Sequence, residues 1–183
     1  DPVITANQTS SLSFPRISSF QIIDICEHVK TLFQFETTIL EVHSPVIIVG
    51  DIHGHVVDLF RVLRSCGMPP RRKYIFLGDL VDRGEFSIET VVIIFLLKLV
   101  YTDHVYLIRG NHEFSSLCQQ SGFFSEIIQT FDEPSVYNSC LDVFSYLPLA
   151  IKIDNQYLCV HGGIGPDFTN LSLFRNVHRP MAD

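Results

Sequence analysis

The chain has 183 residues, a length typical of one domain, and 46% of them are hydrophobic, including 15 Phe. This content supports a packed core and excludes a disordered chain. The formal net charge of −7 argues against nucleic-acid binding, which normally requires a basic face. The longest apolar run, residues 91–97, is much shorter than the roughly 20 residues that cross a membrane. We therefore expect a globular protein that binds neither nucleic acid nor a membrane.

The cysteines are odd in number and scattered, and no Cys-x-x-Cys pair occurs. This pattern favours reduced thiols and a cytoplasmic or nuclear location, or both. No basic-then-apolar leader is present at the start. The first residue is Asp and not Met, so the chain is expected to be a fragment. The five thiols belong to Cys26, Cys66, Cys118, Cys140 and Cys159.

The first third of the chain predicts a tail, a helix, a strand and a second helix. Residues 1–14 lack periodicity and are expected to form a loose tail. Ser18 and Gln21 have the spacing of a capping box at the start of a helix. The β-branched run 45–49 predicts a buried strand, and the helical spacing of apolar residues within 56–66 predicts the next helix.

The rest of the chain also alternates between predicted strands and predicted helices. Strands are predicted at 74–77 and 105–108, with a strongly apolar helix at 87–99 between them. Further helices are expected around 121–130 and 136–146. Residues 148–153 and 156–160 flank Asp154-Asn155 and predict a hairpin.

Four polar loops that contain glycine follow four of the predicted strands: 50–55, 78–84, 109–113 and 161–163. The alternation of strands and helices favours an α/β architecture with these loops along one edge of a sheet. Their oxygen and nitrogen donors suit Mn, Fe or Zn, and they are numerous enough for two ions about 3.5–4 Å apart. These donors are Asp51, His53, Asp79, Asp82, Asn111, His112, Glu113 and His161.

Taken together, the four loops resemble the signature of a known family. They read Gly-Asp-x-His-Gly, Gly-Asp-x-Val-Asp-Arg-Gly, Arg-Gly-Asn-His-Glu and His-Gly-Gly. This order is similar to that of the phosphoprotein phosphatases, the serine/threonine phosphatases of the calcineurin-like metallophosphoesterase superfamily. The resemblance implies an α/β sheet sandwich flanked by helices. It also implies that residues 15–183 form the N-terminal part of an incomplete catalytic domain whose C-terminal portion is missing.

Matching positions carry the family's metal ligands to this chain. Asp51 and His53 resemble the ligands of a first ion, and Asp79 resembles the carboxylate that bridges both ions. Asn111 and His161 resemble ligands of the second ion. The implied cofactors are two divalent or trivalent metal ions, Mn, Fe or Zn.

Three further residues resemble the parts that act on the substrate. His112 resembles the general acid that protonates the leaving alkoxide, and Asp82 resembles its orienting partner. Arg83 resembles a phosphate-binding arginine, because a planar guanidinium matches two phosphate oxygens.

Other polar residues of these loops are expected to be structural. Arg109 and Glu113 are charged neighbours in one loop, and His55 stands where the family usually has an uncharged amide. The family places a further ligand histidine and a second phosphate-binding arginine downstream of His-Gly-Gly. His178 is the only later histidine, and its surroundings do not resemble that ligand.

The resemblance implies hydrolysis of phosphoserine and phosphothreonine in proteins by a metal-activated bridging water. Phosphorylated proteins are then the substrates, and regulatory subunits are further partners. Two alternatives stay open: a related phosphoesterase that acts on nucleotides, and a truncated, inactive metal-binding module.

Overall fold

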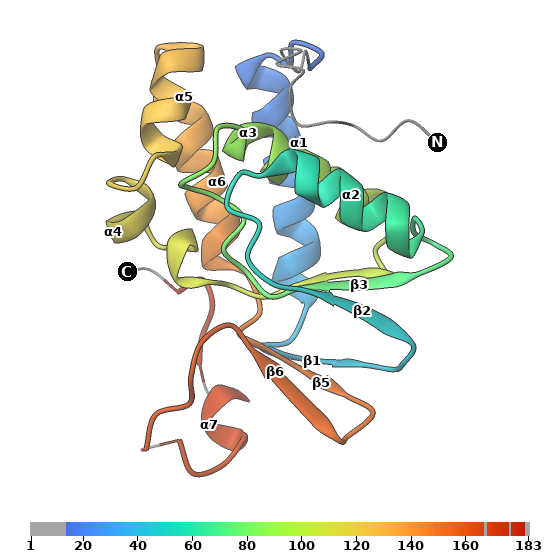
Figure 1. The fold of residues 1–183 in the computed structure, drawn as a ribbon. Coiled ribbons are helices and arrows are strands. Elements are labelled where there is room, and N and C mark those ends of the chain that lie inside the picture. The colour runs from blue at the N-terminus through green and yellow to red at the C-terminus, as the bar shows by residue number, and fades with distance from the viewer. Residues whose placement is uncertain (1–13, 167, 176, 182–183) are drawn as a thin grey trace.

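Two three-stranded sheets pack face to face, and helices cover the outer face of one of them (Figure 1). The computed structural model describes residues 14–166, 168–175 and 177–181. The helix-covered sheet has the order β2-β3-β4, with parallel strands Val46–Val49, Lys73–Phe76 and Val105–Leu107. The second sheet has the order β1-β5-β6, with strands Ile39–Val42, Ala150–Ile153 and Tyr157–Val160.

The longer helices agree with the sequence prediction within a few residues. The predicted capping box of α1 is present, since Ser18 Oγ accepts from Gln21 N at 3.3 Å and Gln21 Oε1 accepts from Ser18 N at 3.0 Å. The short elements η1, α4 and α7 were not predicted. The helices are α1 Ser19–Phe35, α2 Val56–Cys66, α3 Ser87–Val100, the 3-10 turn η1 Asn111–Glu113, α4 Ser115–Cys118, α5 Phe123–Phe131, α6 Ser135–Ser145 and α7 Ser172–Arg175.

Strand β3 links the two cores, because successive side chains of a strand point to opposite faces. Tyr74 and Phe76 belong to the large core that the helices form, whereas Ile75 belongs to the smaller core between the sheets. All three side chains are fully buried. This placement fixes the carboxyl end of β3, from which the central loop of the site departs.

The sheet sandwich that the resemblance implies is confirmed, because the chain forms two sheets. The expectation that all four polar loops lie along one sheet edge was wrong, because the fourth loop follows β6 of the second sheet. β1 was not predicted at all, and it pairs in parallel with β5, with Ile39 opposite Ala150. The predicted hairpin is confirmed: β5 and β6 are antiparallel, and Asp154 and Asn155 both have positive φ angles in the turn. β6 therefore delivers the last motif from the second sheet.

The predicted tail of residues 1–14 lies outside the described residues except for Phe14. Its ring lies 5.5 Å from the Phe86 ring and 6.4 Å from the Phe60 ring, between centroids. No helix within the described ranges is long and apolar enough to cross a bilayer.

Candidate metal centre

The four polar loops converge on one place although they come from two sheets. Three of them follow the carboxyl ends of β2, β3 and β4, which lie side by side because those strands are parallel. The fourth follows β6. His161 crosses to the other sheet, where its Nδ1 lies 2.8 Å from the carbonyl oxygen of Leu77.

Asp79 lies at the centre of the convergence, with a side chain that is only 4% exposed. Its Oδ2 is 3.4 Å from His53 Nε2, and its Oδ1 is 3.3 Å from His161 Nε2. Asp51 Oδ2 lies 3.8 Å from His53 Nε2 and is half-exposed. Asn111 Oδ1 lies 2.8 Å from His161 Nε2. All five predicted ligands are therefore neighbours, with one carboxylate between the two imidazoles.

The tautomer of His53 suits metal binding. His53 Nδ1 lies 2.7 Å from the carbonyl oxygen of Val81, and His161 Nδ1 is bonded to a carbonyl in the same way. A carbonyl only accepts, so the Nδ1 of His53 carries the proton and its Nε2 presents a lone pair. His53 Nε2 is buried and has no hydrogen-bond partner among the described residues. A buried lone pair beside two carboxylates fits a cation at this position.

Two sets of donors lie close enough to hold an ion, with the donor atoms of each set within 4.8 Å of one another. One set contains His53, Asp79 and His112, and the other contains Asp51, Asp79 and His161. Asp79 is common to both sets, as a bridging ligand must be. By proximity Asp51 also groups with His161, so the division of the ligands between two ions stays a prediction.

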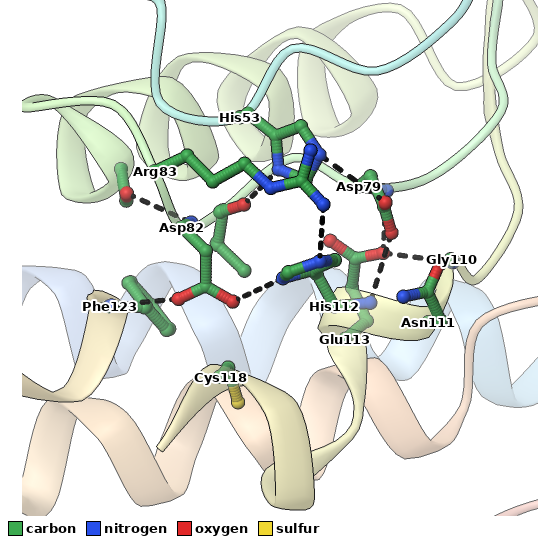
Figure 2. A network of polar contacts seen from close by, with 12 residues as sticks. His53, Asp79, Asp82, Arg83, Gly110, Asn111, His112, Glu113, Cys118 and Phe123 are labelled. Atoms are coloured by element: carbon green, nitrogen blue, oxygen red, sulfur yellow. Dashed lines mark hydrogen bonds and ion pairs between the residues drawn. The ribbon is translucent and has the colours of Figure 1, made fainter. Parts of the chain in front are cut away.

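His112 is held in a defined orientation beside this centre (Figure 2). Its Nδ1 lies 2.7 Å from Asp82 Oδ2, and its backbone N–H donates to Asp79 Oδ1 at 2.9 Å. Arg83 Nη2 lies 3.2 Å from His112 Nε2 and donates to it. Asp82 is fully buried, and its Oδ1 accepts from Phe123 N at 2.8 Å. The buried carboxylate therefore fixes the ring and can balance the charge of a protonated imidazole.

Glu113 supports the loops and does not face the centre. Its fully buried carboxylate accepts from the N–H groups of Asp79, Leu80 and Gly110, each at 2.8 Å. Burial raises its pKa, and these hydrogen bonds oppose the shift. Arg109 donates from Nε and Nη2 to the Glu113 carbonyl oxygen, at 3.2 and 3.0 Å. Both residues therefore occupy the structural positions expected for them.

Positive φ angles concentrate in the same loops. His53, Asp79, Asp82 and Arg83 have φ between 46° and 71°, in the left-handed region that L-residues rarely adopt. The turns need close approach as well: a Cβ at Gly110 would collide with the Asp79 carboxylate and backbone.

His55 and His178 both lie outside the two donor sets. His55 precedes α2, with its Nδ1 3.1 Å from the Ile52 carbonyl oxygen. His178 is exposed and lines a pocket with Glu36 and Arg179. All five cysteines are free thiols.

Comparison with known proteins places the chain in a family. A sequence profile of the calcineurin-like phosphoesterases matches residues 44–181. The chain is 43% identical over 159 residues to the serine/threonine-protein phosphatase ppe1 of Schizosaccharomyces pombe, a match that covers 87% of this chain and 52% of that protein. The chain thus spans about half the length of that relative.

Solved structures agree with this match. A serine/threonine phosphatase from Saccharomyces cerevisiae, with similarity to human phosphatase PP5, superposes with a TM-score of 0.85 at 32% identity. The match covers 91% of this chain and 55% of that one. A putative diadenosine tetraphosphatase superposes less well, with a TM-score of 0.50 at 25% identity over 72% of this chain and 57% of that one.

The chain therefore belongs to the calcineurin-like phosphoesterase family. Within that family, it is similar to the serine/threonine protein phosphatases, and its mixed α/β fold matches theirs.

The two predicted cation sites should differ in affinity. The first predicted site offers the carboxylates of Asp51 and Asp79 with His53, whereas the second predicted site offers Asp79 with His161 and the neutral amide of Asn111. A carboxylate binds a hard cation more strongly than an amide does. Titration of the metal-free chain with Mn²⁺ by calorimetry should give two dissociation constants at least about tenfold apart, a difference of about 1.4 kcal/mol.

The variant Asn111→Asp adds a carboxylate to the weaker predicted site and should bring the two dissociation constants closer together. His55→Asn is the control and should leave both constants unchanged. Equal affinities in the parent chain would contradict the assignment of ligands.

Proposed function

We propose that this chain takes part in metal-dependent hydrolysis of phosphoserine and phosphothreonine esters in proteins. The observation that carries the proposal is the position of Asp79, whose two oxygens face His53 and His161 while its Oδ1 also holds the backbone of His112. His112 and Asp82 together form what we call the acid pair. The Asp79 side chain thereby joins the candidate metal centre to this acid pair. Phosphorylated proteins as substrates, regulatory subunits as partners and a cytoplasmic or nuclear location are further parts of the proposal, and the free cysteines support the location.

The residues present fit two cations held by Asp51, His53, Asp79, Asn111 and His161. When bound, such ions would neutralise phosphate charge and lower the pKa of a water molecule. Phosphoryl transfer needs positioning and charge neutralisation more than covalent chemistry, and the loops supply both.

The chain's own residues then act on the ester. The Arg83 guanidinium would bind two phosphate oxygens in parallel. Arg83 now donates to His112 Nε2, so its move to the phosphate frees that nitrogen to carry a proton. His112 would give this proton to the serine or threonine oxygen as the ester bond breaks, while Asp82 balances the ring's charge.

Turnover of matched substrates by the Mn²⁺-loaded chain tests the proposal. Peptides that carry phosphoserine, phosphothreonine or phosphotyrosine at one position should be compared with a diadenosine polyphosphate. The proposal expects the highest kcat/KM for phosphoserine and phosphothreonine. Preference for the dinucleotide would favour the nucleotide phosphoesterase, and metal binding without turnover would favour the inactive module.

Arg83→Ala should weaken substrate binding more than it weakens metal binding. Loss of a bidentate charge-assisted contact costs about 1.5–3 kcal/mol, which corresponds to a rise of about 10- to 150-fold in the inhibition constant of inorganic phosphate. Arg83→Lys should restore only part of this affinity, because an ammonium cannot bind both oxygens in parallel. Arg61→Ala is a matched control, since Arg61 pairs with Asp58 on the exposed face of α2. Unchanged phosphate inhibition in Arg83→Ala would refute the phosphate-binding role.

A further inference from the structure

Helix α5 contacts the loop that carries Asp82 and Arg83 at two places. At its start, the Phe123 N–H donates to Asp82 Oδ1 at 2.8 Å (Figure 2). One turn later, the Glu126 carboxylate accepts from Ser87 N at 3.0 Å and from Ile88 N at 2.9 Å, at the start of α3. The loop is therefore held at both ends by one short helix.

Ser87 joins the second contact to the acid pair. It is fully buried, and its Oγ accepts from the Asp82 N–H at 3.2 Å. Its own N–H is one of the two that Glu126 holds. A path of hydrogen bonds thus runs from Glu126 through Ser87 and Asp82 to the His112 ring.

The charge and the position of Glu126 suit it to accept hydrogen bonds at the start of α3. The first N–H groups of a helix lack partners within the helix and form its positive end, so a carboxylate that accepts two of them stabilises that end. α3 has no side-chain cap of its own, because Phe86 occupies the capping position. Burial raises the pKa of Glu126, and the hydrogen bonds from Ile88 and Ser87 oppose that shift.

The backbone that Glu126 holds needs such support. Asp82 and Arg83 both adopt positive φ angles, 71° and 66°. Residues in this conformation persist only where their surroundings impose it. If the start of α3 shifted, the Ser87 hydroxyl would leave the Asp82 N–H, and the Asp82 carboxylate would turn away from His112.

We propose that Glu126 is a positioning residue for the acid pair, because it fixes Ser87 and, through it, the Asp82 carboxylate that orients His112. Glu126 makes no contact with the donor sets and none with the predicted phosphate site. The proposal deepens the proposed function, since the reaction that it serves is the protonation of the leaving group. The positioning itself is measurable without turnover.

Two variants remove the hydrogen bonds of Glu126 to different degrees. Glu126→Gln keeps the shape of the side chain, but it can accept from only one of the two N–H groups and presents its NH₂ group to the other. Glu126→Ala loses both contacts. Glu89→Gln is the matched control for loss of charge, because Glu89 also lies in the first turn of α3, whereas the N–H groups of Ser87 and Ile88 bond to Glu126. Glu89 acts on Glu126 through its charge.

The first readout is the proton resonance of the His112 Nδ1–H, which its bond to the Asp82 carboxylate shifts downfield. Both Glu126 variants should move this resonance upfield and broaden it by faster exchange with water, more strongly in Glu126→Ala. The Nδ1–H signals of His53 and His161, which bond to backbone carbonyls, are internal references and should stay in place. Glu89→Gln should leave all three signals unchanged.

The second readout is the dependence of turnover on the leaving group. Glu126→Gln should lower turnover of an alkyl phosphoester by about tenfold and that of an activated aryl ester by less than about twofold, because only the alkoxide needs a well-placed acid. An unfolding defect would lower both by the same factor.

Two results would overturn the positioning role. One is an unchanged His112 signal in both Glu126 variants while the Ser87 and Ile88 amides exchange faster, which would make Glu126 a helix cap alone. The other is an equal change at His53, His161 and His112, which would indicate general loosening. Failure of the proposed function is distinct: it would appear as absent phosphoester turnover in the parent chain, with the His112 signal still responding to Glu126.

Discussion

Asp79→Asn should remove both cations from the protein. One Asp79 oxygen lies 3.4 Å from His53 Nε2 and the other lies 3.3 Å from His161 Nε2, so this carboxylate is shared by both donor sets. A neutral amide cannot neutralise two cations, and its NH₂ group would face one imidazole lone pair. Because changes to residues that only support a ligand already cost 10- to 100-fold in metal affinity, loss of the shared ligand should cost more than about 100-fold at each site.

Calorimetric titration with Mn²⁺ and elemental analysis after gel filtration measure this loss. The fold should survive, because Glu113 holds residue 79 through its backbone N–H, which the substitution keeps. Asp51→Asn is the matched control: Asp51 belongs to one donor set and is half-exposed, so its loss should weaken binding without abolishing it. Two ions bound to the Asp79→Asn variant would contradict the bridging role of Asp79.

His112→Asn should slow the hydrolysis of alkyl phosphoesters by roughly 10²–10⁴-fold, the usual contribution of a general acid. Its Nδ1 bond to Asp82 orients the ring, and no other imidazole shares that carboxylate among the described residues. An aryl ester should lose far less, since its leaving group needs little protonation. The ratio of the two rate losses is therefore the measurement.

Metal content separates this role from ligation, because His112 also stands in a donor set with His53 and Asp79. His112→Asn should keep both ions if the ring is an acid. His55→Asn, in the loop before α2, is the matched control and should change neither the rates nor the metal content. Equal rate losses on both esters, or loss of an ion, would assign His112 to the metal and not to the leaving group.

Most of the site could be predicted from local pattern. Asp51 and Asp79 each follow a short apolar run that ends at a glycine, Asn111 follows such a run after Arg109 and Gly110, and the structure brings their loops together. Parallel strands with their carboxyl ends at one edge make such a prediction reliable. The hairpin of β5 and β6 could also be predicted, because Asp154 and Asn155 tolerate the positive φ angles of its turn.

Pairing between distant segments could not be predicted. β1 is four residues long with Glu41 in its middle, and its partner is β5, more than a hundred residues later. The local pattern alone did not show that β5 and β6 belong to a separate sheet, so His161 was expected at the same sheet edge as the other ligands. Glu126 was missed for a related reason: its partners are two backbone N–H groups of another helix, and backbone groups leave no mark in a sequence.

The left-handed backbone conformation of His53, Asp79, Asp82 and Arg83 places functional side chains at a cost in folding stability. Each such residue costs of order 1–3 kcal/mol, whereas glycine adopts the same conformation without that penalty. Glycine at Arg83 would therefore relieve strain, partly offset by the greater freedom of an unfolded glycine, and would remove the guanidinium. Selection for heat resistance alone would favour such exchanges in these loops, and a thermostable descendant would have to gain its stability elsewhere to keep its chemistry.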